Sequence, residues 1–121
     1  MLVKKQLFDD KILIFKGVGL KYCKLINIEI KKILKENNIS AISIEDQKFE
    51  ITNVSMILRS NLEVFILINS HIDESIIKIY KSGIKVIIIN PHEEVMSLLL
   101  DNNLINLVKY VTFIKMKIED F

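Results

Sequence analysis

The stretch from residue 63 to residue 94 constrains the fold of this chain more than any other part of it. It contains two short apolar runs, residues 64–68 and 86–89, joined by a segment with helical spacing that ends at Gly83. Runs of four or five residues that are rich in Ile and Val are typical of strands buried on both faces. Two such strands with a helix between them predict a parallel βαβ unit and hence an α/β fold.

The rest of the chain continues this alternation of strand and helix. Asn90, Pro91 and Glu93 have the spacing of a helix start, with Asn90 as the N-cap, Pro91 at the first helical position and Glu93 as the capping-box partner. Asparagine tolerates a left-handed backbone, so two pairs of asparagines are expected to end helices: Asn37 and Asn38, and Asn102 and Asn103. Further strands are expected at residues 11–15, 39–44 and 109–115, and helices at residues 20–36, 52–60, 70–82 and 91–101.

Polarity orders the strands. The second and fifth expected strands mix polar and apolar residues, which is typical of sheet edges, whereas the first, third and fourth are apolar throughout. With right-handed crossovers, the order 2-1-3-4-5 puts the two mixed strands at the edges. We therefore predict a flavodoxin-like, three-layer αβα sandwich with a five-stranded parallel sheet of that order.

The length of 121 residues fits a single domain. Its expected parts are an N-terminal arm (1–10), a doubly wound core (11–115) and a short tail (116–121). No apolar run approaches the roughly 18 residues that a membrane span needs, and the N-terminus lacks the apolar core of a signal peptide. A cytoplasmic location and no membrane partner are therefore expected.

The charged residues and the cysteine limit the possible partners. The chain has 17 basic and 15 acidic residues, and Arg59 is its only arginine. The lysines are scattered rather than clustered, so specific nucleic-acid binding is not expected. The single cysteine, Cys23, excludes an internal disulfide and a site with several thiolate ligands, and no metal or cofactor is predicted.

Ligands of a doubly wound sheet bind beyond the carboxyl ends of the strands, at the point where the strand order reverses. In the predicted order this point lies between the first and third strands, and the fourth strand ends one strand away. No catalytic residue is predicted. The residues expected to bind a ligand at these strand ends are Lys16, Gly17, Gly19, Asn69, Ser70, His71, Asn90 and His92.

Each candidate in this set has a simpler explanation. The glycines Gly17 and Gly19 begin a dinucleotide fingerprint, but Tyr22 stands where the third glycine belongs, so turn chemistry is favoured. Lys16 could hold a phosphate together with helix N–H groups, or could simply be solvated. The histidines His71 and His92 could share a metal or move protons, but no further ligand at a suitable spacing completes such a site, and polar residues at helix starts are favoured.

Cys23 could form a stabilised thiolate near the start of the first helix. Phosphocarrier domains of the sugar phosphotransferase type place a cysteine directly at the end of their first strand. In this chain Lys16 occupies that place and Cys23 comes seven residues later. The position favours a buried structural cysteine.

The order of strands and helices from residue 11 to residue 115 is similar to that of receiver domains of two-component signalling. Lys115 stands where a receiver has its lysine. Lys16 and Gly17 replace the acidic pair that holds Mg²⁺, however, and Asn69 replaces the aspartate that accepts phosphate. The resemblance would imply a pseudo-receiver without phosphotransfer, and it covers the order of elements rather than the functional residues.

Two functions follow as hypotheses. The first is a non-catalytic regulatory or protein-interaction module, because no complete catalytic set is present. The alternative is a small enzyme or carrier subunit that binds a small anionic, phosphate-bearing ligand at the ends of the first and third strands. A homodimer or another protein partner is also expected, because the predicted winding leaves one face of the fourth and fifth strands without a helix.

Overall fold

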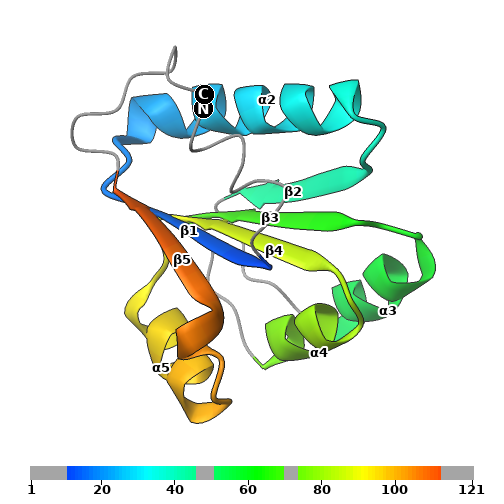
Figure 1. The fold of residues 1–121 in the computed structure, drawn as a ribbon, viewed down its shortest axis with the longest axis vertical. Coiled ribbons are helices and arrows are strands. Elements are labelled where there is room, and N and C mark those ends of the chain that lie inside the picture. Colours follow the sequence, from blue (N-terminus) through cyan, green and yellow to red (C-terminus); the bar gives the residue numbers. More distant parts are fainter. Residues whose placement is uncertain (1–10, 46–50, 70–73, 113–121) are drawn as a thin grey trace.

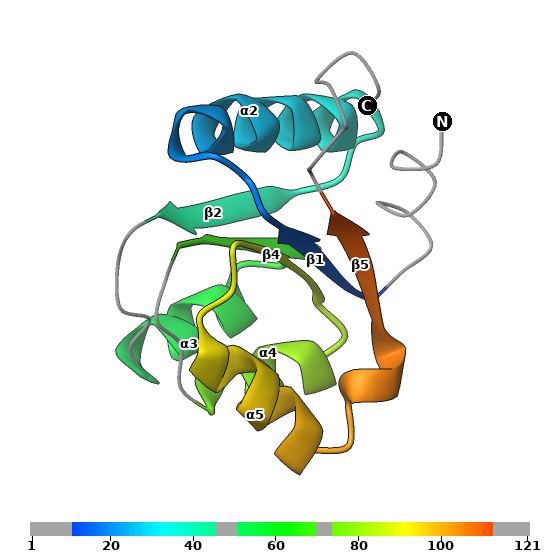
Figure 2. The same ribbon diagram turned by 90° about the vertical axis from the view of Figure 1, so that its left-hand side faces the viewer.

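The computed structural model describes residues 11–45, 51–69 and 74–112, which form a five-stranded parallel sheet with helices on both faces (Figures 1 and 2). This confirms the predicted α/β class. The predicted N-terminal arm and C-terminal tail lie outside the described residues. The strands are β1 (Ile12–Lys16), β2 (Ala41–Glu45), β3 (Val64–Ile68), β4 (Lys85–Ile89) and β5 (Val108–Thr112), and the helices are α2 (Leu20–Glu36), α3 (Ile51–Arg59), α4 (Ser75–Lys81) and α5 (Glu93–Asp101), with a 3-10 turn η1 (Ile105–Leu107).

The strand order is β2-β3-β4-β1-β5, so the predicted order 2-1-3-4-5 is wrong and a flavodoxin-like sheet is not what forms. β1 pairs with β4 and β5, with Phe15 opposite both Ile89 and Val111. The two edge strands, β2 and β5, are the ones that polarity predicts. The error concerns the three interior strands, because all three are apolar on both faces and polarity cannot rank them.

The helices lie on the two faces as right-handed crossovers require. α2 covers one face of the sheet, and α3, α4 and α5 cover the other (Figure 1). From β1 the chain crosses to the far edge at β2, then returns through β3 and β4 and passes β1 to reach β5. The reversal of direction after β2 reverses the face on which the crossover helix lies. No helix in the described part of the chain has both the length and the apolar character needed to cross a membrane.

Two apolar cores result, one on each side of the sheet, because successive strand residues point to opposite faces. We call them the α2 core and the three-helix core. The buried members of the α2 core are Leu13, Phe15, Val18, Cys23, Ile26, Ile30, Ile33, Leu34, Val64, Ile66, Ile68, Ile87 and Ile89. The buried members of the three-helix core are Ile12, Ile14, Ile57, Phe65, Leu67, Ile76, Ile77, Ile79, Ile84, Val86, Ile88, Val95, Leu99, Leu104 and Val108.

The bare strand face expected from the sequence does not occur on β4. This strand lies in the middle of the sheet, and Val86, Ile87, Ile88 and Ile89 are all buried. The dimer predicted from the sequence therefore loses the exposed β4 face that motivated it. Self-association stays a prediction, and sedimentation equilibrium at micromolar concentration would contradict it by finding only a monomer.

Asparagines with a left-handed backbone lie just after helix ends. Asn38 and Asn103 follow α2 and α5 with φ of 59° and 58°, which confirms the predicted left-handed ends. The predicted start of α5 is wrong by two residues, because His92 is the N-cap and Glu93 the first helical residue. Asn90 has φ of 56°, whereas an N-cap residue has an extended backbone, so Asn90 does not cap the helix.

Candidate functional site

The point where the sheet changes direction lies between β1 and β4. These strands are neighbours, yet the chain leaves β1 for α2 on one face and leaves β4 for α5 on the opposite face (Figure 1). A crevice opens between the carboxyl ends of two such strands, and ligands of open α/β sheets bind there. The predicted position between the first and third strands is wrong, because β4 separates β3 from β1.

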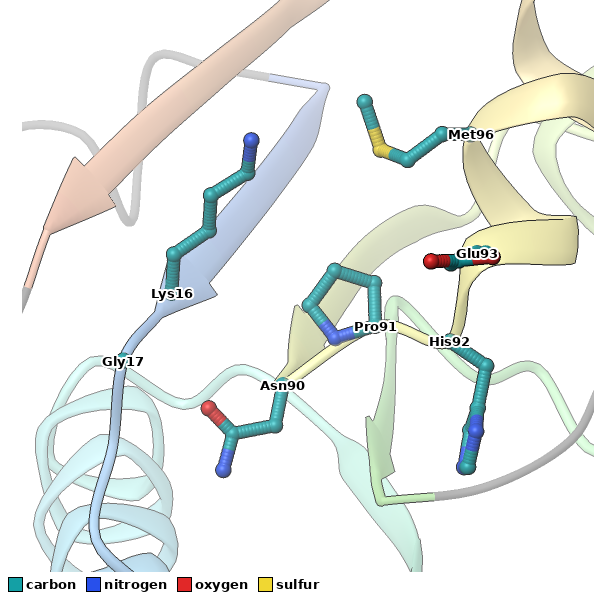
Figure 3. A pocket seen from close by; sticks show the side chains of 7 residues that line it. All are labelled: Lys16, Gly17, Asn90, Pro91, His92, Glu93 and Met96. Carbon is teal, nitrogen blue, oxygen red and sulfur yellow. The ribbon is translucent and has the colours of Figure 1, made fainter.

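A pocket of about 300 Å³ lies at this crevice (Figure 3). That volume is at the lower end of the range for small-molecule sites. The lining includes four of the eight residues predicted from the sequence. The pocket is lined by Lys16, Gly17, Asn90, Pro91, His92, Glu93 and Met96.

Asn90 holds the two walls of the pocket together. Its backbone N–H donates to the carbonyl of Phe15 at 2.8 Å. Its side-chain Oδ1 accepts from the backbone N–H of Val18 at 2.9 Å, and its Nδ2 donates to the carbonyl of Val18 at 2.7 Å. The side-chain amide therefore pairs with both the N–H and the carbonyl of Val18, as a peptide group of a neighbouring strand would. Gly17, with φ of 71°, supplies the left-handed turn between Lys16 and Val18.

Lys16 reaches the pocket because of its place in the strand. It alternates with Phe15 and so lies on the same side as Ile12 and Ile14, toward α5. Its Nζ lies 4.2 Å from the centre of the Tyr110 ring on β5. The Tyr110 hydroxyl is in turn 4.0 Å from Sδ of Met96. This cation–π contact, worth about 0.5–1 kcal/mol at an exposed site, holds the lysine beside the pocket.

Cys23 lies beneath the strand ends and is 1% exposed. The side-chain amides of Asn69 and Asn90 place their Nδ2 atoms 3.6 Å and 3.5 Å from its Sγ, and the thiol donates to the carbonyl of Gly19 at 3.6 Å. This burial agrees with the structural cysteine favoured by the sequence. The sulfur joins the ends of β3 and β4 to the first turn of α2.

The other predicted residues lie near the pocket or outside the described chain. Asn69 directly follows β3, the strand next to β4, and its carbonyl lies 3.3 Å from Nε2 of His92. Because a carbonyl oxygen can only accept, this contact is a hydrogen bond when Nε2 of His92 carries a proton. Gly19 is the N-cap of α2 and does not line the pocket. Ser70 and His71 lie outside the described residues.

Three lining residues, Pro91, Glu93 and Met96, are absent from the predicted set. The sequence assigns Pro91 and Glu93 to the start of the helix expected at residues 91–101, and Met96 to its interior. Because α5 begins at Glu93, Glu93 and Met96 are one turn apart and share a side of the helix. The spacing of Glu93 and Met96 in the sequence therefore indicates that the two side chains lie together. It does not show that they face a pocket, because that requires knowing that β4 lies beside β1.

The pocket carries both signs of charge. Lys16 contributes an ammonium from β1, and Glu93 contributes a carboxylate from the first turn of α5 (Figure 3). No ion pair joins these two side chains, both of which the structure describes. Among residues 11–45, 51–69 and 74–112, no three His, Cys, Asp or Glu side chains gather in a group that could hold a metal ion.

No family model, curated protein or solved structure that was compared with the chain matches it.

Proposed function

We propose that this chain is a binding domain for a small ligand with an anionic group, held in the pocket between β1 and β4. The observation that carries the proposal is the ammonium of Lys16 beside a pocket at the point where the sheet changes direction. The volume of about 300 Å³ suits a small metabolite rather than a dinucleotide. A phosphate or a carboxylate of the ligand would lie against Nζ of Lys16.

Pre-organisation of the pocket supports the same proposal. Asn90 fixes the loop after β1, and the Tyr110 ring holds the lysine head group. Neither wall has to be ordered when a ligand arrives, which lowers the entropic cost of binding. No covalent step is part of the proposal, because the lining residues do not include a nucleophile paired with a base.

The other function expected from the sequence, a non-catalytic regulatory or protein-interaction module, stays a prediction. A pocket of this kind is compatible with it, since a bound ligand can regulate a partner. No feature of the described residues favours a particular partner.

Lys16→Met is expected to weaken the binding of anionic ligands about tenfold. The substitution removes one charge-assisted contact, and a tenfold change corresponds to about 1.4 kcal/mol. Methionine keeps most of the length of the side chain and its apolar character. A thermal-shift screen with inorganic phosphate and a panel of monocarboxylates comes first, because a ligand at 100 times its Kd raises the free energy of unfolding by about 2.7 kcal/mol. The affinities of the ligands that bind are then measured by isothermal titration calorimetry.

The matched control is Lys81→Met. Lys81 is an exposed lysine in the last turn of α4, which ends just before β4 begins and therefore near the amino end of that strand, whereas the pocket lies at the carboxyl ends. This variant should bind as the unaltered protein does. Equal binding by both variants would show that Lys16 does not contact the ligand, and a flat thermal-shift response across the panel would remove the proposal.

A further inference from the structure

Resting on the proposed function, we infer that the ligand is a zwitterion of the amino-acid class, with its carboxylate against Lys16 and its ammonium against Glu93. A pure anion would use only half of the pocket's charges. Lys16 and Glu93 come from opposite walls, β1 and α5, with Pro91 and Met96 from the same loop and helix as Glu93 (Figure 3). Opposite charges that share a pocket without pairing suit a ligand that carries both complementary charges.

Glu93 argues against a doubly charged phosphate. The N-terminus of a helix carries about half a positive charge, which by itself would attract an anion. In α5 the carboxylates of Glu93 and Glu94 already stand in the first turn and offset that charge. A dianion in the pocket would therefore be repelled by the carboxylate of Glu93, whereas a helix start without acidic residues would attract it. A monocarboxylate at Lys16, away from Glu93, avoids this repulsion.

A ligand ammonium reverses the effect of Glu93. It would gain a charge-assisted contact with the carboxylate, and the partial charge of the helix end would be too small to outweigh a full negative charge nearby. The remaining lining is the pyrrolidine ring of Pro91 and the thioether of Met96, both partly exposed. These apolar groups suit the aliphatic part of a small amino acid, and methionine adapts to side chains of different shape.

The experiment compares pairs of ligands that differ only in the amino group. Alanine, leucine and methionine are each titrated beside the corresponding carboxylic acid without the amino group, and inorganic phosphate is titrated as an anion without an ammonium. The proteins are the unaltered chain, Lys16→Met, Glu93→Gln and the control Glu36→Gln. Glu36 is an exposed carboxylate at the end of α2, on another part of the surface.

We expect the unaltered chain to bind at least one amino acid about tenfold more tightly than its partner acid, the effect of one charge-assisted contact. Glu93→Gln should remove this preference, by weakening the amino acid while leaving or tightening the acid. Lys16→Met should weaken both members of the pair. Glu36→Gln should change neither.

The outcomes separate the two proposals. If phosphate or the acids bind through Lys16 but no amino acid is preferred, or if Glu93→Gln leaves the preference unchanged, the zwitterion is wrong and the anion-binding function stands. If no probe binds the unaltered chain, both proposals are wrong. The side chains of Lys16 and Glu93 are both exposed, so the two variants and the unaltered chain should have the same melting temperature without ligand. Agreement of these temperatures excludes misfolding as the cause of lost binding.

Discussion

Replacing Phe15 with alanine is expected to lower the free energy of unfolding by about 4 kcal/mol, within the range of about 3–5 kcal/mol for a buried phenylalanine. Phe15 is fully buried in the α2 core and lies on β1, which has a neighbouring strand on each side. Its removal leaves a cavity between the sheet and α2 that the paired strands cannot close. The measurement is urea denaturation followed by circular dichroism.

The matched control is Ile42→Ala on the edge strand β2. Ile42 is 44% exposed, so its truncation removes much less buried surface than that of Phe15 and should cost only about 1 kcal/mol. A cost for Phe15→Ala as small as that of the control would contradict the enclosure of β1 beneath α2. Since a domain of this size has about 5–15 kcal/mol of stability in total, the loss at Phe15 could populate the unfolded state at moderate temperature.

Local patterns in the sequence predict which segments form strands and which form helices. The run at residues 64–68 is a strand over those same residues, and α2 spans residues 20–36 as its apolar stripe predicts. The distribution of the helices between the two faces is not affected by the error in strand order, because it depends on the direction in which the chain moves rather than on which strands are skipped. These features rest on periodicity and handedness, which a single sequence carries.

The order of the interior strands could not be predicted in the same way. β1, β3 and β4 are each buried on both faces, so exchanging their positions leaves the same residues buried. The choice depends on how side chains from distant segments interlock, as where Phe15 lies opposite Ile89. No local pattern reports such a match, and the predicted order 2-1-3-4-5 depends only on the polarity of the two edge strands.

The candidate site inherited this error. The sequence predicts four residues of the pocket because each follows a strand, and the structure brings them together: Lys16, Gly17, Asn90 and His92. In the predicted strand order the crevice lies between the first and third strands, however, so Asn90 and His92 are expected one strand away from it. Tyr110, which contacts Lys16, could not be selected without knowing that β5 lies beside β1.

Asn90 gives the second large effect, because its side chain ties two loops that are far apart in the sequence. Asn90→Ala is expected to cost about 3 kcal/mol of unfolding free energy. It would leave the N–H and carbonyl of the buried Val18 without their amide partners, at about 1–3 kcal/mol for each buried group left unpaired. It would also put alanine at a positive φ, which costs a further 1 kcal/mol or so.

Asn38→Ala separates these two contributions in the same denaturation experiment. Asn38 has φ of 59°, almost the same as the 56° of Asn90, but its side chain is exposed at the end of α2. The two variants therefore share the cost of the left-handed backbone, and the difference between them, expected at about 2 kcal/mol, measures the amide's pairing with Val18. Equal costs would mean that this pairing does not hold the loop after β1. If the pairing does hold that loop, Asn90→Ala should also lose affinity for the ligand, because the wall beside Lys16 is then no longer fixed.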